Sequence, residues 1–284
     1  MKTRPEALSG EEDNVLNNSR FAISDADLNK LRNKAELPLY FTCVVINVFA
    51  IAMVILSFVY FDNIGIAYYI AFGYLFINLF ISLGSTFSAV RLNSVRISGE
   101  QFSDIYGVAC RYAKILGMKK VPEIYVKQNG GIINAFASYF FFRNYVLINS
   151  DVFEVAYIKN KDIDAVSFIL AHEMAHIAFN HTKYWYNAGI LVSKFIPFLY
   201  SALSRAREYS CDNVAKFLCP QGKHGIFIIL LGKHLYNCVN IDAYLKQAHN
   251  TRGWFEFYAN ATSSHPVPVR RIAAVYDAGR QRIL

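Results

Sequence analysis

The sequence predicts a mainly α-helical α+β fold with a small β-sheet, attached to a membrane by an N-terminal two-helix transmembrane hairpin. Two long uncharged runs stand near the N-terminus, later segments have the 3.6-residue period of helices, and two short segments alternate like strands. Hydrophobic residues make up 54% of the 284 residues and charged residues only 18%. This balance is more apolar than that of soluble domains, which favours membrane-spanning segments.

Residues 1–37 are polar and highly charged and show no sustained period, so we expect a mostly flexible N-terminal tail. A short helix is predicted to begin after Ser24. Serine is a favoured N-cap, and Asp27 follows at the third helical position.

The two uncharged runs occupy residues 38–61 and 65–90, and each can cross a hydrocarbon core of about 30 Å. Two buried core helices are the alternative, but consecutive runs of this length without a charge favour membrane spans. Lys and Arg flank the pair on both outer sides and are absent from the link at 62–64. Because these residues favour the cytoplasm, we predict a hairpin over 38–90 with both ends cytoplasmic.

Residues 91–284 are predicted to form one globular domain. Residues 99–116 carry a helical apolar stripe that ends at Gly117, whereas 121–128 and 143–149 read as strands. Further helices are predicted over 164–182, 204–218, 223–240 and 269–283.

Charge and cysteine content exclude some classes of protein. The formal net charge is +8, but the basic residues are scattered rather than gathered in a stripe. This argues against a nucleic-acid partner and suits an anionic cytoplasmic leaflet of a lipid bilayer. Five cysteines without a CxxC pair argue against a disulfide framework and fit a reducing compartment.

Residues 171–177 read AHEMAHI, which contains an HExxH motif. On a helix, His172 and His176 lie about 40° apart and can hold one metal ion together. Glu173 beside them can accept a proton from water and deliver it to a leaving amine. A chance motif with satisfied core histidines is the alternative, but two histidines and a glutamate on so apolar a helix would be costly without a partner.

A catalytic zinc usually takes three protein ligands and keeps one open position. His181 lies five residues after His176, about 140° away on a helix, so we expect a surface or cap residue there. Glu208 is the better third ligand, and Asp212, four residues later, can accept the free ring N–H of a ligand histidine, His172. A solvated charged face that pairs with neighbouring arginines remains the alternative for this carboxylate pair.

These residues resemble the HtpX-like zinc metallopeptidases, a gluzincin family that also contains the type I CAAX prenyl endopeptidases. AHEMAHIAFNH resembles the family's zinc helix, and SRAREYSCD at 204–212 resembles its third-ligand segment. INAFAS at 133–138 and SSHPVPVRRI at 263–272 resemble two further motifs, in the same order. The resemblance covers about 94–284. It departs at Val267, where the family has a second proline, at Cys211, where alanine is common, and in the small number of spans.

The resemblance implies a zincin-type metalloprotease domain that holds one zinc ion per chain through His172, His176 and Glu208. It also implies that His265 and Arg271 stabilise the oxyanion of the tetrahedral intermediate. A helix start with Pro266 at its first position and an exposed arginine is the alternative for that pair. A rim strand is implied to hold the substrate backbone by strand addition, and the alternative is a plain core strand. The implied rim residues are Asn134, Ala135, Phe136 and Ala137.

The sequence thus favours a membrane-anchored endopeptidase that cuts polypeptides, in particular membrane or membrane-proximal proteins, from the cytoplasmic side. Protein quality control is the task that the resemblance implies. A processing protease for a defined, for example lipidated, substrate is the enzymatic alternative, and an inactive adaptor is the non-enzymatic one. Retention of Glu173 and of all the expected ligands argues against the adaptor. Oligomeric state is not predicted.

Residues 187–203 are apolar but are predicted not to cross the membrane. They contain Lys194 and Pro197, which disfavour a span. They also lie between His176 and Glu208, and a single crossing there would place two ligands of one metal on opposite sides of the bilayer. We therefore expect this stretch beside the cleft, near the membrane surface.

Overall fold

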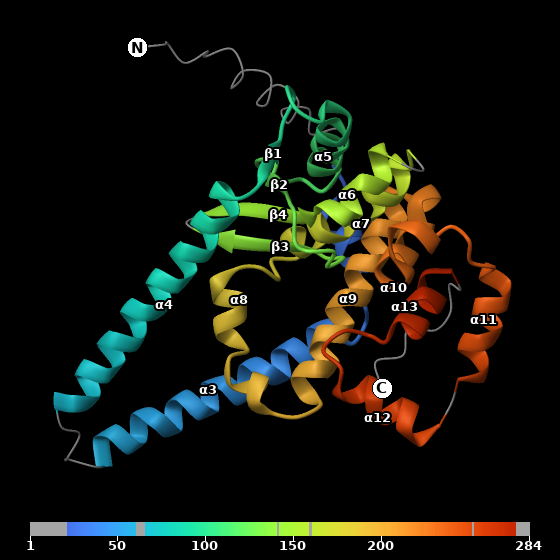
Figure 1. The fold of residues 1–284 in the computed structure, drawn as a ribbon. Coiled ribbons are helices and arrows are strands. Elements are labelled where there is room, and N and C mark those ends of the chain that lie inside the picture. Colours follow the sequence, from blue (N-terminus) through green and yellow to red (C-terminus); the bar gives the residue numbers. More distant parts are fainter. Residues whose placement is uncertain (1–21, 61–65, 141, 159–160, 252, 277–284) are drawn as a thin grey trace, which may run out of the picture.

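The computed structural model describes residues 22–60, 66–140, 142–158, 161–251 and 253–276 (Figure 1). Helices dominate these residues and surround one four-stranded sheet, which confirms the predicted α+β fold class. The predicted link at 62–64, most of the predicted tail and the end of the helix expected over 269–283 lie outside the described residues.

Helices and strands follow the predicted order, with additional short elements between them. The strands are β1 Val95–Ile97, β2 Glu123–Lys127, β3 Ala135–Phe140 and β4 Arg143–Asn149. The first helices are α2 Asp25–Lys30, α3 Glu36–Tyr60, α4 Ile66–Leu92, α5 Ser103–Ile115, α6 Ser150–Tyr157 and α7 Ile163–Ala178. Then come α8 Tyr184–Gly189, η2 Val192–Phe195, α9 Leu199–Leu218, η3 Pro220–Gly225, α10 Ile226–Leu235, α11 Ile241–Asn250, α12 Trp254–Thr262 and α13 Pro268–Tyr276.

The described part of the N-terminal segment packs against the domain. Ser24 caps α2 as predicted, and its hydroxyl accepts a hydrogen bond from the Asp27 amide at 3.1 Å. Leu28 belongs to the main core, and the Asn33 amide donates to Ser210 Oγ on α9 at 2.8 Å. Residues 22–36 therefore differ from the flexible tail expected from their composition, because contacts with distant residues hold them.

Helices α3 and α4 project together from one side of the globule (Figure 1). Each contains a stretch long and apolar enough to cross a membrane, Glu36–Ser57 and Ile70–Leu92. Large apolar side chains along both, such as Phe49 and Phe76, are exposed. This exposure does not fit the alternative of buried core helices, and both helices fit a membrane anchor.

The sheet has the strand order β1-β2-β4-β3, in which β2 and β4 are parallel and the other two pairs are antiparallel. Alternate residues of β4 face opposite sides. Val146 and Ile148 join the main helical core, whereas Tyr145 and Leu147 pack against the end of α4. Strand β3 stands at the end of the sheet, next to the helix that carries HExxH.

Helix α7 runs through the centre of the domain and packs against α9, η3, α5 and α6. The turn at η3 approaches it very closely. A Cβ at Gly222 would lie 2.1 Å from the Asp164 carbonyl oxygen, and one at Gly225 would lie 2.4 Å from that of Ala165. Only glycine fits at these two positions, so this turn fixes the start of α7.

Residues 187–203 form no continuous helix. They contain the end of α8, then η2 and the start of α9. Among the described residues, only α3 and α4 contain candidate spans. Ile190 and Leu203 pack with Cys43 of α3, and Asn47 of α3 accepts a hydrogen bond from the Val192 amide at 3.0 Å. The stretch thus packs along the first half of α3.

Candidate active site

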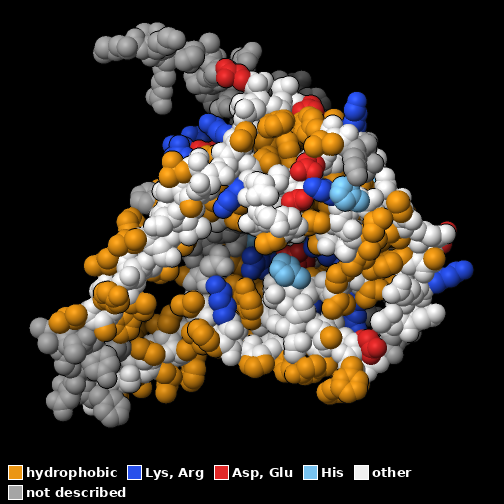
Figure 2. Space-filling view, viewed as in Figure 1, with side chains coloured by type: hydrophobic (Ala, Val, Ile, Leu, Met, Phe, Trp, Pro, Cys, Tyr) orange, Lys and Arg blue, Asp and Glu red, His pale blue; other side chains and the backbone are white. Residues whose placement is uncertain are grey.

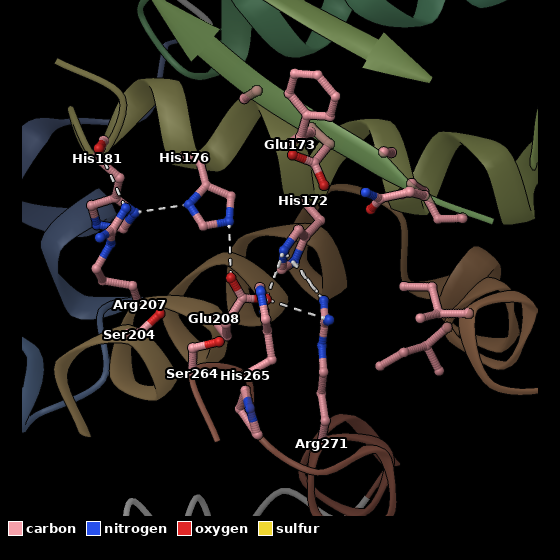
Figure 3. A pocket seen from close by; sticks show the side chains of 18 of the residues that line it. His172, Glu173, His176, His181, Ser204, Arg207, Glu208, Ser264, His265 and Arg271 are labelled. Atoms are coloured by element: carbon pink, nitrogen blue, oxygen red, sulfur yellow. Dashed lines mark hydrogen bonds and ion pairs between the residues drawn. The ribbon is translucent and has the colours of Figure 1, made fainter. Parts of the chain in front are cut away.

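Helix α7 places both histidines and the glutamate of HExxH on the wall of a cavity of about 720 Å³. Asp162 caps the helix, and its side chain accepts a hydrogen bond from the Ala165 amide at 3.0 Å. The motif stands on the third and fourth turns, where the core holds the helix on both sides. Figure 3 shows His172, Glu173 and His176 projecting from α7 toward the cavity.

Helix α9 brings Glu208 between the two histidines. Glu208 Oε2 lies 3.4 Å from His172 Nε2, and Glu208 Oε1 lies 3.4 Å from His176 Nε2. One donor atom from each of the three residues lies within 4.8 Å of the others. Burial would raise the pKa of Glu208, but the bonds to His172 and His176 hold it well below its ordinary value. The carboxylate is therefore a buried anion between two imidazoles, a donor set that fits a zinc ion.

Asp212, one turn after Glu208, contacts His172 from the other side. Its Oδ1 lies 2.9 Å from His172 Nδ1. Burial and the nearby Arg271 lower the pKa of His172, but the bond to Asp212, the charge of Asp212 and the bond to Glu208 together outweigh them and raise it to about 9. Burial would raise the pKa of Asp212, and Arg271 holds it below its ordinary value. Glu208 and Asp212 are both buried, which does not fit the alternative of a solvated charged face.

Arg271 on α13 is held in the same cluster. Its Nε and Nη2 donate to Asp212 Oδ2 and Oδ1 at 2.7 and 2.8 Å, and its Nη1 lies 3.4 Å from Glu208 Oε2. Its side chain is 12% exposed, so the alternative of a freely exposed arginine is wrong. The same alternative placed Pro266 at the first helical position, whereas α13 begins at Pro268.

His265 is an accessible member of the predicted site. It lies between α12 and α13, its side chain is 68% exposed, and its Nδ1 is 3.4 Å from Glu208 Oε2. The bond to Glu208 raises the pKa of His265. The histidine therefore stands at the mouth of the cavity, on the side opposite α7 (Figure 3).

Strand β3 forms another wall of the cavity. The cavity is lined by the residue before β3 and the first four residues of the strand: Asn134, Ala135, Phe136, Ala137 and Ser138. On its inner side β3 pairs with β4, from Ala135 opposite Ile148 to Phe140 opposite Arg143. Because β3 ends the sheet, its outer edge is not paired with another strand among the described residues.

His181 is not the surface residue that helical geometry predicts. Helix α7 ends at Ala178, and Asn180 has φ of +62°, so the chain turns back before His181. The side chain is fully buried, and burial lowers the pKa of His181 to about 3. Its Nδ1 lies 3.1 Å from His176 Nδ1, and with Cys211 these two histidines form a second group that could hold a metal.

Glu36 is a site-related residue that the sequence analysis missed. Its carboxylate is fully buried, and its Oε1 lies 3.0 Å from His181 Nε2. The available signal was its position, since a charged residue that opens an otherwise uncharged span needs a partner.

Residues 99–196 match the family model of peptidase family M48. The matched part is about a third of the chain and includes α5, the sheet beyond β1 and the HExxH helix. Among curated proteins, none matches the chain. Peptidases of this family are zinc-dependent. The match agrees with the resemblance and includes two of its four motifs, INAFAS at 133–138 and the HExxH helix, whereas the other two lie beyond the matched residues.

Proposed function

Since the match to peptidase family M48 is consistent with a membrane zinc metallopeptidase, we propose that this chain is a membrane-anchored zinc endopeptidase. The observation that carries the proposal is the meeting of His172, His176 and Glu208 within 4.8 Å on the wall of one cavity. These residues come from two helices with 20 residues of chain between them. No ordinary packing requirement brings two imidazoles and a carboxylate to one buried point.

The three residues would hold one zinc ion per chain, with the fourth position open to the cavity. The ion supplies Lewis-acid polarisation of the scissile carbonyl and lowers the pKa of water. Asp212 orients His172 through its Nδ1, which leaves Nε2 directed toward Glu208.

Glu173 is the general base of the proposed reaction. It is not part of the donor group, and it lines the cavity beside the two histidines. Its carboxylate can take a proton from the attacking water and pass it to the leaving amine. The outer edge of β3 would hold the substrate backbone in an extended form by strand addition, with Asn134 as the polar contact.

His265 and Arg271 are proposed to stabilise the oxyanion. We expect His265→Ala to lower kcat by about 10²-fold or more while KM changes little, because an oxyanion contact strengthens in the transition state. Steady-state hydrolysis of a quenched fluorescent peptide measures both constants. A rise in KM with unchanged kcat would instead assign His265 to substrate binding.

The lipid bilayer is the proposed partner of α3 and α4, and membrane-proximal polypeptides are the proposed substrates. Asn47 lies 11 residues after Glu36, which is about 16 Å along the helix. The Asn47 side chain is bonded to the Ala188 carbonyl oxygen and the Val192 amide. The segment around η2 therefore runs beside the first half of α3, and Phe195 on it is 83% exposed.

An apolar surface continues from the segment around η2 to α12. Phe198 contacts Tyr258 of α12, and Trp254 of the same helix stacks on Tyr258. Hydrophobic side chains gather along the two long helices and along the lower edge in the region of α12 (Figure 2). Contact of this surface with the cytoplasmic leaflet would hold the cavity close to the membrane, where apolar substrate segments emerge.

Residues on either side of 187–203 are expected on one side of the membrane, the cytoplasmic side. Trp185 and Phe217 are both exposed and bracket the segment. Cysteines at these positions, with Cys110 and Cys238 changed to serine, should both react with an impermeant maleimide added from the cytoplasmic side. Labelling from opposite sides would defeat both the topology and the choice of Glu208 as a ligand.

The substrate class is tested by comparing membrane proteomes of cells that carry the wild type or Glu173→Gln. Protein quality control predicts many membrane proteins that accumulate in the variant, whereas a processing protease predicts one or a few. Identical proteomes and identical protein half-lives would argue against a protease of membrane proteins.

A further inference from the structure

A buried chain of hydrogen bonds joins the candidate metal ligand His176 to the first residue of the anchor helix α3. His176 Nδ1 lies 3.1 Å from His181 Nδ1, and His181 Nε2 lies 3.0 Å from Glu36 Oε1. The side chains of His181 and Glu36 are both 0% exposed. The other ring nitrogen of His176, Nε2, faces Glu208. Figure 3 shows His181 beside His176, on the side away from His172.

The order of donors in this chain follows from the chemistry of its ends. A carboxylate can only accept, so His181 Nε2 carries the proton that is donated to Glu36. His181 Nδ1 is then free to accept, and His176 Nδ1–H donates to it. A histidine protonated on Nδ1 offers the lone pair of Nε2, which is the atom that faces Glu208.

Glu36 is held at the end of the chain by further partners. Arg32 and the Ser210 hydroxyl both donate to its carboxylate. Ser210 stands two residues after Glu208 on α9 and also accepts from the Asn33 amide. The segment that enters α3 is therefore tied to α9, which carries the third candidate ligand.

The ring of His181 is fixed as well. Its amide donates to the His176 carbonyl oxygen at 2.9 Å, and its own carbonyl oxygen accepts from Asn187 Nδ2 at 3.0 Å. The rings of Phe179 and Tyr186 have centroids 5.6 and 5.5 Å from its centroid. These contacts leave the imidazole little freedom to turn away from His176.

We propose that Glu36 and His181 are positioning residues that fix the tautomer and orientation of His176 as a metal ligand. The inference rests on the proposed zinc site. It makes the entry to the membrane anchor a part of the active site, because a shift of the first turn of α3 would move Glu36 and loosen His176.

The test is the zinc affinity of the full chain in detergent, measured by competition with a chromogenic chelator. His181→Phe removes both bonds and keeps a planar ring, so its zinc dissociation constant should rise about 10–100-fold. His181→Gln should restore most of the affinity, because its amide oxygen can accept and its amide nitrogen can donate. Glu36→Gln keeps the shape but offers only a neutral acceptor, and it should weaken zinc several-fold.

Two control variants test whether the loss of any histidine weakens zinc binding and whether Cys211 is itself a ligand. His224 pairs with Asp162 at 2.7 Å but contacts none of the proposed ligands, so His224→Gln should keep the wild-type zinc affinity. Cys211→Ala should also keep it, because in the proposed chain the thiol is only a neighbour of His181 Nδ1 at 3.8 Å. Loss of zinc from Cys211→Ala would place the metal between His176, His181 and Cys211 and would overturn the inference.

Different results would refute the positioning role and the proposed function. A wild type that binds no zinc would remove the proposed metal site itself. A wild type that binds zinc, together with unchanged affinity in Glu36→Gln and in His181→Phe, would leave the site intact and refute the positioning role. Glu36→Gln decides the question alone if His181→Phe does not fold. A lower melting temperature at unchanged zinc affinity would show a structural role only.

Discussion

Glu173→Gln is expected to lower kcat/KM for peptide hydrolysis by about 10²–10⁴-fold while the chain still binds one zinc ion. An amide cannot take the proton from water, whereas the donor group of His172, His176 and Glu208 does not include residue 173. Peptide hydrolysis and metal content measured on the same preparation check both halves of this expectation.

His172→Ala is the matched control, because it removes a proposed ligand instead of the base. His172→Ala should lose both hydrolysis and zinc binding, whereas Glu173→Gln should lose only hydrolysis. Turnover near that of the wild type in Glu173→Gln would show that another group acts as the base. Loss of zinc from Glu173→Gln would mean that Glu173 is itself a ligand.

The parts of the fold that follow from local pattern were predictable. The runs at 38–61 and 65–90 form helices α3 and α4, and the strands expected over 121–128 and 143–149 form β2 and β4. The same holds for α7, because HExxH lies on a segment with sustained helical period. Short elements such as β1 and α12 were missed, since three to nine residues carry little periodic signal.

Contacts between distant segments could not be predicted. The sequence places His181 five residues after His176, and an ideal helix would turn it away. The positive φ of Asn180 breaks the helix and returns the imidazole to its neighbour. Its partner Glu36 is 145 residues away, in a segment whose composition is that of a tail. Neither the end of α7 nor this pairing is encoded in a periodic pattern.

The contacts of Arg271 also could not be predicted from its motif. The family resemblance implies that Arg271 contacts the oxyanion, and the structure shows that its guanidinium also pairs with two buried carboxylates. The guanidinium meets Asp212 through two parallel bonds and lies 3.4 Å from Glu208 Oε2. Burial lowers the pKa of Arg271, but the two carboxylates outweigh it and raise that pKa above its ordinary value. The arginine is thus the buried counter-charge of the site.

Arg271→Ala is therefore expected to destabilise the zinc-free chain by about 3–5 kcal/mol, because it leaves Asp212 as a buried anion without its main partner and removes the arginine beside Glu208. Arg271→Lys keeps the charge but cannot make both parallel bonds, so it should lie between the wild type and Arg271→Ala. Denaturant unfolding of the zinc-free chain in detergent gives the comparison.

His265→Ala supplies the control for this experiment. His265 lines the same cavity and contacts the same Glu208 oxygen, but its side chain is mostly exposed, so its removal should leave the free energy of unfolding nearly unchanged. Both variants should lose turnover, yet only the loss in Arg271→Ala should come with instability. Equal stability of the two variants would assign Arg271 to the transition state alone. In that case the bonds between Arg271 and Asp212 would contribute little to the free energy of folding, and His172 would be the main partner of Asp212.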